Sequence, residues 1–196
     1  MIDFYTNPQS RGLIAHWMLE EIGEPYTVRV LDYGAMMKAP EYLAINPMGK
    51  VPALVHDGAI VTEVAAICTY LAETFPKAGL APTASERAAY YRWMFFAAGP
   101  VEAAVTNTAM GFVVPDERKR AMGYGSFDDV VAALDQHLSH SAFFAGDRFT
   151  AVDVYAGSQV GWGMQFGTLP KRPSFETYWE RIKDCPARLA VMGALG

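Results

Sequence analysis

The residues best suited to bind a ligand lie in the segment Asn46–Leu54, which reads NPMGKVPAL. Pro52 stands within an apolar strand pattern but has no N–H to donate, so it belongs at a sheet edge or in a tight turn, where a cis peptide bond is plausible. Val51, the residue before it, would then present its backbone N–H and C=O to a ligand. We therefore expect a cis Val51–Pro52 bond beside an open cleft.

A second binding feature is the start of the helix that follows this segment. The apolar strand Ala59–Val61 runs into Thr62, a good N-cap for a helix over Glu63–Glu73. The first turn of such a helix offers unpaired N–H groups and the positive end of the helix dipole, and both favour a carboxylate. Val51 and this helix start together have the layout of a site for a peptide thiol.

The elements that must position these residues begin with alternating strand and helix patterns. Ile2–Tyr5 reads as a strand, Arg11–Ile22 as a helix that ends at Gly23, and Tyr26–Leu31 as a second strand. A β-α-β beginning of this kind favours a parallel pair of strands with a crossover helix.

Two more strands complete the first part of the chain. After the poorly periodic stretch Asp32–Ile45 come Val51–His56 and Ala59–Val61, joined by Asp57-Gly58, which is a strong hairpin signal. With the helix from Glu63, this β-β-α arrangement predicts a thioredoxin-like α/β domain over residues 1–76.

The rest of the chain has a different character. Residues 76–85 are rich in Pro and Gly and form a linker pattern, which places a domain boundary there. Beyond it, apolar residues recur at helical spacing and predict an all-α domain over residues 85–196. The helical stretches are Ala88–Ala98, Val130–Leu138, Val152–Trp162 and Phe175–Ile182. Thr150 and Asp153 have the spacing of an N-terminal capping box, which is a structural role and not a catalytic one.

The chain resembles the soluble glutathione transferases along nearly its whole length. NPMGKVPAL matches the family pattern N-P-x-G-K-V-P-x-L, and VTEVAAICTYLAE matches L-T-E-S-x-A-I-x-x-Y-L. WMLEEIGEPYTV near the start and FFAGDRFTAVDVYAG in the second half lie in the family's order. The resemblance implies a thioredoxin-like domain, an all-helical domain, glutathione as co-substrate without a metal, and a homodimer.

A transferase of this family must stabilise the glutathione thiolate, because an unperturbed thiol titrates at about 8.5. A hydrogen-bond donor aimed at the sulfur, near a helix start, lowers that pKa. Ser10 lies in the loop where the resemblance places a catalytic Tyr, Ser or Cys, although serine is also a favoured N-cap. Aligning GLIAH with a bacterial cysteine-bearing class puts Arg11 there instead. Tyr5, Thr6 and Asn7 are rivals.

The resemblance also assigns the glutathione contacts. Val51–Pro52 would pair with the cysteinyl backbone, and Glu63 with Val64 matches the family's acid–serine pair for the γ-glutamyl end. Val64 departs from the pattern because it lacks the serine hydroxyl, and a charge-assisted hydrogen bond contributes about 1.5–3 kcal/mol. Weak glutathione affinity or a changed ligand follows as a hypothesis. Lys50 and Lys38 are candidates for the glycyl carboxylate.

The second domain would supply the site for a hydrophobic electrophile. Its aromatic and sulfur-bearing candidates are Tyr90, Trp93, Met94, Phe96, Met110, Phe112 and Trp162. Aromatic residues at helical spacing usually belong to the core, so we expect most of these side chains to be buried.

Composition excludes several other classes of protein. The 196 residues carry a net charge of −5 with both signs mixed along the chain, so no electrostatic footprint for nucleic acid exists. The two cysteines, Cys68 and Cys185, fit neither a disulfide framework nor a metal site, and Cys68 is expected to be a buried apolar residue.

The four histidines are expected to be structural or surface residues: His16, His56, His137 and His140. No stretch resembles a membrane span or a signal peptide, so we expect a cytoplasmic protein without a membrane partner.

The leading functional hypothesis is a glutathione transferase that conjugates the glutathione thiolate to a hydrophobic electrophile. One alternative is a glutathione-dependent disulfide reductase or isomerase, which uses the same thiolate. The other alternative is a non-catalytic binding or regulatory protein of the same fold, because fold does not settle function. The valine at position 64 favours this third hypothesis.

Overall fold

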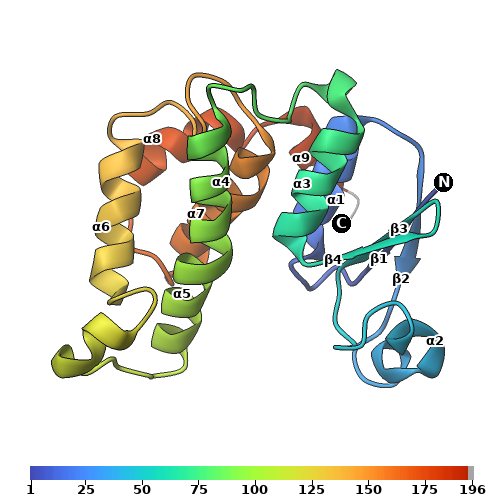
Figure 1. Cartoon of the computed structure of the whole chain (residues 1–196), viewed down its shortest axis with the longest axis horizontal. Coiled ribbons are helices and arrows are strands. Elements are labelled where there is room, and N and C mark those ends of the chain that lie inside the picture. The colour runs from blue at the N-terminus through green and yellow to red at the C-terminus, as the bar shows by residue number, and fades with distance from the viewer. Residues whose placement is uncertain (194–196) are drawn as a thin grey trace. The chain divides into compact units, whose positions relative to one another are not determined.

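The first three sequence patterns form a β-α-β unit, as predicted. In the computed structural model, which describes residues 1–193, strands β1 (Ile2–Thr6) and β2 (Tyr26–Val30) are parallel along their whole length. Helix α1 (Gly12–Ile22) connects them (Figure 1). It ends at Gly23, whose φ of 69° is a left-handed conformation that glycine adopts without a side-chain clash.

The predicted hairpin is also present. Strands β3 (Ala53–His56) and β4 (Ala59–Thr62) are antiparallel, and Asp57 and Gly58 between them have φ angles of 48° and 87°. Two positive φ angles suit the tight turn that matches the twist of paired strands. β3 also pairs antiparallel with β1, which gives a four-stranded mixed sheet in the order β2-β1-β3-β4.

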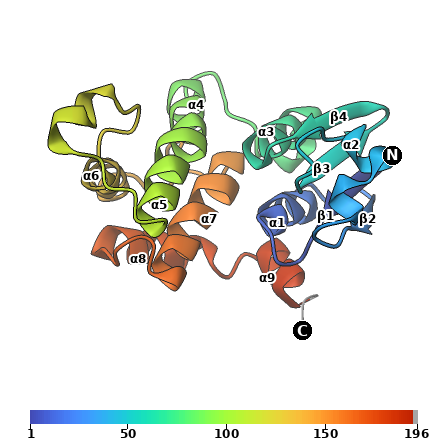
Figure 2. The same cartoon turned by 90° about the horizontal axis from the view of Figure 1, so that it is seen from below.

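Helix α3 (Val64–Thr74) lies beside α1 and contacts β3 and β4 (Figures 1 and 2). The prediction that Thr62 caps this helix is wrong. Thr62 pairs with Ala53 in the last position of β4, so the chain is still extended there. The turn into the helix therefore falls on Glu63, which is the N-cap and makes no side-chain capping hydrogen bond.

The poorly periodic stretch 32–45 contains two short helical pieces, a 3-10 turn at Met36–Lys38 and helix α2 (Pro40–Leu43). Met37 and Tyr42 from these pieces form a small cluster with Ala53 of β3, and Tyr5 packs against it. Successive strand residues point to opposite faces, so this cluster lies across the sheet from the core that holds the Phe4 side chain. Short pieces of this kind have too few turns to produce a visible period.

The second part of the chain is helical, as predicted. Its helices are α4 (Arg87–Phe96), α5 (Glu102–Ala109), α6 (Phe127–Leu138), α7 (Ala151–Phe166) and α8 (Pro173–Ile182). A π-type turn at residues 97–101, which contains Pro100, joins α4 to α5, and a 3-10 turn at Asp116–Ala121 precedes α6. α5 and both turns were not predicted. Proline lacks the N–H for a regular helical bond, which accounts for the local change at Pro100.

Helix α7 is buried on nearly all sides, which is the pattern of a central helix. Two of its glycines allow α8 to approach closely. A Cβ atom on Gly157 would lie 2.7 Å from the Tyr178 hydroxyl, and one on Gly161 would lie 2.4 Å from the Trp179 ring. Side chains at these two positions would therefore separate α7 from α8.

The chain divides into two compact units, one made of Met1–Ala81 with the chain from Cys185, and the other of Pro82–Asp184. The division at residues 81 and 82 falls within the predicted linker. Helix α9 (Pro186–Gly193) packs on α1, so it groups with the first unit although the sequence placed residues 85–196 in one helical domain. Residues 194–196 of that domain lie outside the described residues. Throughout residues 1–193, no helix combines the length and apolarity needed to cross a membrane.

Candidate functional site

The Val51–Pro52 peptide bond is cis, as predicted. Pairing of β3 with β1 begins only at Ala53, opposite Tyr5, so Val51 lies just outside the sheet. Within residues 1–193, the backbone N–H and C=O of Val51 make no hydrogen bond. Both groups are therefore left unpaired by the sheet, as the sequence predicted, and their pairing with a peptide ligand stays a prediction.

The peptide plane before Val51 is held by two side chains that sequence reasoning missed. The Tyr42 hydroxyl and the Asn46 amide nitrogen both donate to the Lys50 C=O, at 2.6 and 2.7 Å. Tyr42 is almost fully buried, and burial raises the pKa of its hydroxyl to about 12, so the hydroxyl remains a donor at all ordinary pH values. The two donors fix the carbonyl orientation directly before the proposed ligand-binding backbone.

Asn46 also organises the turn that leads to Lys50. Its side-chain oxygen accepts from the Met48 N–H at 3.0 Å, and its backbone C=O accepts from the Gly49 N–H at 2.8 Å. Asparagine side chains commonly form such local turns, so the Asn-Pro-x-Gly sequence pattern could have predicted this turn. Gly49 has φ 57°, and a Cβ atom there would lie 2.5 Å from the Met37 carbonyl oxygen, so the turn requires glycine.

The two candidate lysines differ in their surroundings. The Lys38 Nζ donates to the Met48 C=O at 2.8 Å, so this side chain, although exposed, is bonded to the turn itself. Lys50 is exposed. Of the two, Lys50 is therefore the lysine whose side chain can reach a ligand without giving up that contact.

The start of α3 is open. Glu63 has φ 67° and ψ 123°, a backbone conformation that costs a non-glycine residue about 1–3 kcal/mol. Within the described part of the chain, the N–H groups of Val64, Ala65 and Ala66 donate no hydrogen bond. Three donors at a positive helix end form a receptor for an anion. The Val64 side chain is buried, with 8% exposed, and supplies no hydroxyl.

The start of α1 is closed by Ser10. The Ser10 hydroxyl donates to the Asn7 C=O at 2.6 Å and accepts from the Gly12 N–H at 2.9 Å. The Asn7 side chain in turn donates to the Leu31 C=O at 2.8 Å and accepts from the Gln9 N–H at 2.9 Å. In this arrangement the Ser10 oxygen, one residue before the N-cap Arg11, bonds the first N–H of the helix, and its single O–H is already donated within the loop. Its role toward a thiol remains a prediction.

The rivals of Ser10 occupy three different environments. The Tyr5 ring lies 5.7 Å from the Tyr42 ring, and both Tyr5 and Val51 pack on the Met37–Tyr42–Ala53 cluster. Thr6 is buried at the end of β1, and Arg11 is exposed at the N-cap of α1. The structure therefore brings Tyr5 and Val51 to one cluster, whereas Ser10 and Asn7 bond to each other.

The seven aromatic and sulfur-bearing candidates for an electrophile site separate into three groups by burial. Tyr90, Trp93 and Met94 are buried in the core of the helical unit, with at most 2% exposed. Met110 and Phe112 are exposed by 71% and 68%. Phe96 and Trp162 are half-buried. Three of the seven candidates are therefore core, and the expectation that most of them are buried is not met.

The cysteines and histidines contribute no reactive group to the site. Cys68 is fully buried, and burial raises the pKa of its thiol far above the usual range. His16, His56 and His137 lie within hydrogen-bond distance of the Tyr26 hydroxyl, the Tyr70 hydroxyl and the Phe144 C=O, and His140 lies beside the Gln136 C=O. Among the residues that the structure describes, no cluster of His, Cys, Asp or Glu could hold a metal ion.

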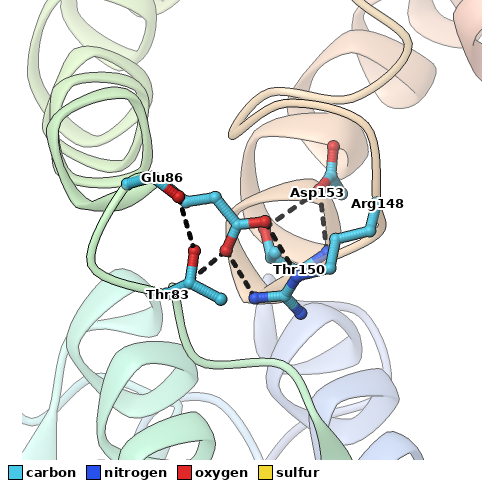
Figure 3. A network of polar contacts seen from close by, with 6 residues as sticks. Thr83, Glu86, Arg148, Thr150 and Asp153 are labelled. Carbon is cyan, nitrogen blue, oxygen red and sulfur yellow. Dashed lines mark hydrogen bonds and ion pairs between the residues drawn. The ribbon is translucent and has the colours of Figure 1, made fainter.

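A separate polar network lies at the start of α7 (Figure 3). Asp153 is fully buried, and its carboxylate accepts from the Phe144 N–H, the Tyr178 hydroxyl and the Thr150 N–H, each at 2.9 Å, and from the Thr150 hydroxyl at 3.1 Å. Burial raises the pKa of Asp153 to about 6, although the hydrogen bonds act in the opposite direction. The carboxylate closes the helix start from inside, as the predicted capping box requires.

Glu86 and Arg148 form the outer part of this network (Figure 3). The Arg148 guanidinium donates twice to the Glu86 carboxylate, at 2.8 and 2.6 Å, and the Thr83 N–H donates to it at 2.7 Å. The Arg148 bonds lower the pKa of Glu86 to about 2. The pair joins the first residues of the helical unit to the loop before α7, so its role is structural.

Comparison with known proteins agrees with these features. Residues 12–74 match the family model for the glutathione S-transferase N-terminal domain, and residues 102–162 match the model for the C-terminal domain. The chain is 30% identical over 200 residues to glutathione S-transferase GST-4.5 of Xanthomonas campestris pv. campestris, covering 96% of this chain and 98% of that protein. It is 29% identical to the disulfide-bond oxidoreductase YfcG of Escherichia coli, covering 95% and 92%.

A solved structure extends this similarity to three dimensions. The structure of a sphingomonad glutathione S-transferase complexed with glutathione matches with a TM-score of 0.78 and 29% identity, over 98% of each chain. The mixed sheet with its helices and the helical unit correspond to the two parts of that fold. The chain belongs to the glutathione S-transferase family of transferase enzymes.

Proposed function

We propose that this enzyme binds glutathione along the Val51 backbone and the start of α3, and adds its thiolate to a hydrophobic electrophile. Two sets of backbone groups that lack hydrogen-bond partners within residues 1–193 carry the proposal. One set is the N–H and C=O of Val51 beside the cis proline, and the other is the N–H groups in the first turn of α3. Family membership supports it, and the sphingomonad relative was solved with glutathione bound.

Each part of the tripeptide has a proposed partner. The Val51 N–H and C=O pair with the cysteinyl backbone of glutathione, and Pro52 keeps that stretch of chain out of the sheet. The γ-glutamyl carboxylate accepts from the N–H groups at Val64, Ala65 and Ala66, and the Glu63 carboxylate accepts from the γ-glutamyl ammonium. Lys50, exposed at the turn, meets the glycyl carboxylate.

The thiolate needs a donor, and Ser10 is the proposed one. Because its O–H is donated to the Asn7 C=O, the hydroxyl must rotate away from that carbonyl when the sulfur arrives. The Gly12 N–H can remain bonded to the Ser10 oxygen during the rotation and keeps the side chain at the helix start. Tyr5, Thr6, Asn7 and Arg11 remain the competing donors.

The reaction itself is a substitution or addition at an electrophilic carbon. The glutathione sulfur forms the new C–S bond, and the thiol proton goes to solvent. In a substitution the leaving group departs with the electron pair of the broken bond, whereas in an addition the electron pair of the broken π bond stays on the substrate, which then takes a proton from solvent. The electrophile is hydrophobic and binds on the helical unit. The enzyme acts in detoxification in the cytoplasm. It is a homodimer, and sedimentation at micromolar protein concentration would measure the mass of the dimer.

Disulfide reduction is the second candidate, and similarity to YfcG favours it. In that reaction two glutathione thiols are oxidised to glutathione disulfide while the substrate disulfide is reduced to two thiols. The described chain has no exposed reactive cysteine pair, because Cys68 is buried and Cys185 is the other cysteine. Both electrons would therefore come from two glutathione molecules.

The deciding experiment is retention on immobilised glutathione followed by two activity assays. Conjugation is measured with 1-chloro-2,4-dinitrobenzene, and reduction with 2-hydroxyethyl disulfide. Retention with conjugation supports the proposal, and retention with reduction alone favours the second candidate. Retention without either activity favours a binding or regulatory protein. Absence of retention, together with an unchanged melting temperature in millimolar glutathione, overturns glutathione binding.

A further inference from the structure

The loop between β1 and α1 is tied at three points to the chain that follows β2. The Leu31 N–H donates to the Thr6 C=O at 2.9 Å, and the Asn7 side chain donates to the Leu31 C=O at 2.8 Å. The third tie is the Tyr33 hydroxyl, which donates to the Gln9 C=O at 3.0 Å. All of these residues belong to the first compact unit, so the arrangement is complete within that unit.

The third tie differs from the other two in its exposure. Thr6 and Asn7 are buried, whereas Tyr33 is exposed by 58%. Gly34 directly after it has φ 93°, a left-handed conformation that glycine adopts without a side-chain clash and that turns the chain at this point. An exposed ring gains little free energy from burial, so the core does not explain where Tyr33 lies. The hydrogen bond to Gln9 therefore contributes to the loop and not to the core.

The carbonyl that Tyr33 holds belongs to the peptide unit that joins Gln9 to Ser10. A peptide unit is planar, so a donor to its oxygen restricts the orientation of the whole plane and of the Ser10 Cα atom. On the other side, the Ser10 oxygen accepts from the Gly12 N–H at 2.9 Å. A Cβ atom on Gly12 would lie 2.9 Å from that same oxygen, so the first turn of α1 leaves it little room. The Ser10 hydroxyl is thus fixed from both ends.

The same arrangement occurs before Val51. There the Tyr42 hydroxyl donates to the Lys50 C=O, and here the Tyr33 hydroxyl donates to the Gln9 C=O. In both places a phenol fixes the peptide plane directly before a residue that the proposed function assigns to glutathione. Tyr42 is almost fully buried and Tyr33 is exposed, so the tie at the Ser10 loop is the one that solvent can open.

We propose that Tyr33 is a positioning residue for the thiolate: it holds the Gln9–Ser10 peptide so that the Ser10 O–H, once it rotates away from the Asn7 C=O, points at the glutathione sulfur. This inference rests on the proposed function, because Tyr33 acts through Ser10. It adds a residue that neither the sequence pattern nor the tripeptide contacts assign. Since the partners proposed for the tripeptide backbone and carboxylates lie at Val51, Lys50 and the start of α3, Tyr33 affects ionisation of the thiol and not glutathione affinity.

The first experiment uses the free enzyme and needs no glutathione. The Gln9 N–H donates to the Asn7 side chain and the Gly12 N–H to the Ser10 oxygen, each at 2.9 Å, so both amides report opening of the loop. Tyr33→Phe should speed their hydrogen exchange, measured by NMR, about fivefold, the size expected for loss of one exposed hydrogen bond. Equal exchange in wild type and Tyr33→Phe would overturn the proposal.

The matched control for this exchange is Tyr70→Phe. It removes the same kind of group from the same unit, but the Tyr70 hydroxyl lies 2.9 Å from His56 Nδ1 and not in the loop. Exchange at Gln9 and Gly12 should therefore stay at the wild-type rate. Equal acceleration by Tyr33→Phe and Tyr70→Phe would mean a general loss of stability, and the proposal would be wrong.

The second experiment measures the thiol itself. The absorbance of the thiolate follows the ionisation of bound glutathione against pH, so the result does not depend on the choice of electrophile. Tyr33→Phe should lower the acid dissociation constant of the bound thiol about fivefold, which raises its pKa, and leave the glutathione Kd from calorimetry within about twofold. In a Ser10→Ala background the same substitution should have no further effect, because the two residues act in series.

The outcomes separate this inference from the proposed function. Faster exchange in Tyr33→Phe without a change in thiol ionisation would overturn the positioning role, and so would a full effect that persists in Ser10→Ala. Absence of glutathione binding by wild type would be a failure of the proposed function. The exchange measurement on the free enzyme would still decide whether Tyr33 holds the loop.

Discussion

The starts of α3 and α7 solve the same physical problem in opposite ways. The first N–H groups of any helix lack partners within the helix. At α7 the buried Asp153 carboxylate, with Thr150, closes the start and is itself bonded to Phe144 and Tyr178. At α3 the N-cap Glu63 makes no such bond, and the chain adopts a strained φ of 67° there.

The start of α7 contributes to stability, whereas the start of α3 is proposed to bind a ligand. At α7 the Asp153 carboxylate bonds the Thr150 N–H and hydroxyl and so fixes the helix start from within the chain, whereas the first N–H groups of α3 lack a partner within residues 1–193. The start of α1 is an intermediate case, because Ser10 closes it with a hydroxyl that can rotate.

The largest effect is expected from opening the start of α7. Asp153→Ala leaves the Phe144 N–H, the Tyr178 hydroxyl and the Thr150 N–H buried without their acceptor, and the free energy of unfolding should fall by about 4 kcal/mol. Urea denaturation followed by tryptophan fluorescence measures it, with Asp128→Ala, on the exposed first turn of α6, as the control. A loss below about 1 kcal/mol would contradict a closed, stabilising start.

This effect should also depend on pH. The folded pKa of Asp153 is about 6, above the usual value of 3.8, so the native state binds more protons than the unfolded state between these values. The stability that Asp153 contributes therefore decreases as pH rises from about 4 to 6. The loss caused by Asp153→Ala should be larger at pH 4 than at pH 7.

The Ser10→Ala variant tests whether the start of α1 has a structural role, as at α7, or serves the bound ligand, as proposed for α3. If the hydroxyl donates to the thiolate, the variant should slow conjugation on the order of 100-fold, raise the pKa of bound glutathione and leave glutathione affinity nearly unchanged. The pH profile of conjugation measures this, with Tyr5→Phe and Arg11→Ala as comparisons. An unchanged profile with reduced stability would mean that Ser10 closes α1 as Asp153 closes α7.

Asn46→Ala tests the other half of the open site. Removing one of the two donors to the Lys50 C=O should loosen the Val51 backbone and weaken glutathione binding about tenfold, while kcat at saturating glutathione changes little. Tyr42→Phe removes the second donor and should give a similar shift in KM. Equal losses in kcat and kcat/KM would show that these residues act on the transition state and not on positioning.

Val64→Ser adds a donor to the open start of α3. The new hydroxyl can reach the γ-glutamyl carboxylate, so glutathione affinity should tighten by up to about tenfold, equivalent to about 1.4 kcal/mol. Calorimetry with glutathione measures it, and Ala65→Ser is the matched control one residue further into the helix. No change, or a loss, would mean that this carboxylate binds elsewhere.

The smallest effect concerns the surface pair that flanks the closed start. The Arg148 bonds lower the pKa of Glu86 to about 2 from a usual value of 4.5, so its contribution is present above about pH 4.5 and is lost as pH falls toward 2. Glu86→Gln should lower stability by about 1 kcal/mol at pH 7 and have no effect near pH 2. The exposed Glu180–Lys183 pair is the control, and Glu180→Gln should change little at either pH.

Features with local causes could be predicted from the sequence. The Asp57-Gly58 turn, the helix end at Gly23, the cis bond at Pro52 and the Thr150–Asp153 box each follow from residue types a few positions apart. Alternating and helical periods gave the order of the main elements for the same reason. The resemblance to the family added the proposed glutathione contacts to this framework.

Features that depend on distant partners could not be predicted in this way. Thr62 has the composition of an N-cap, but pairing with Ala53 keeps it in the strand and moves the turn to Glu63. The hydrogen bonds from Tyr42 to the Lys50 C=O and from Lys38 to the Met48 C=O join residues whose separation along the chain matches neither a helical nor a strand repeat. The packing of α9 on α1 joins opposite ends of the chain. A hydroxyl, an ammonium or an apolar face is compatible with many partners, and only the folded chain selects one.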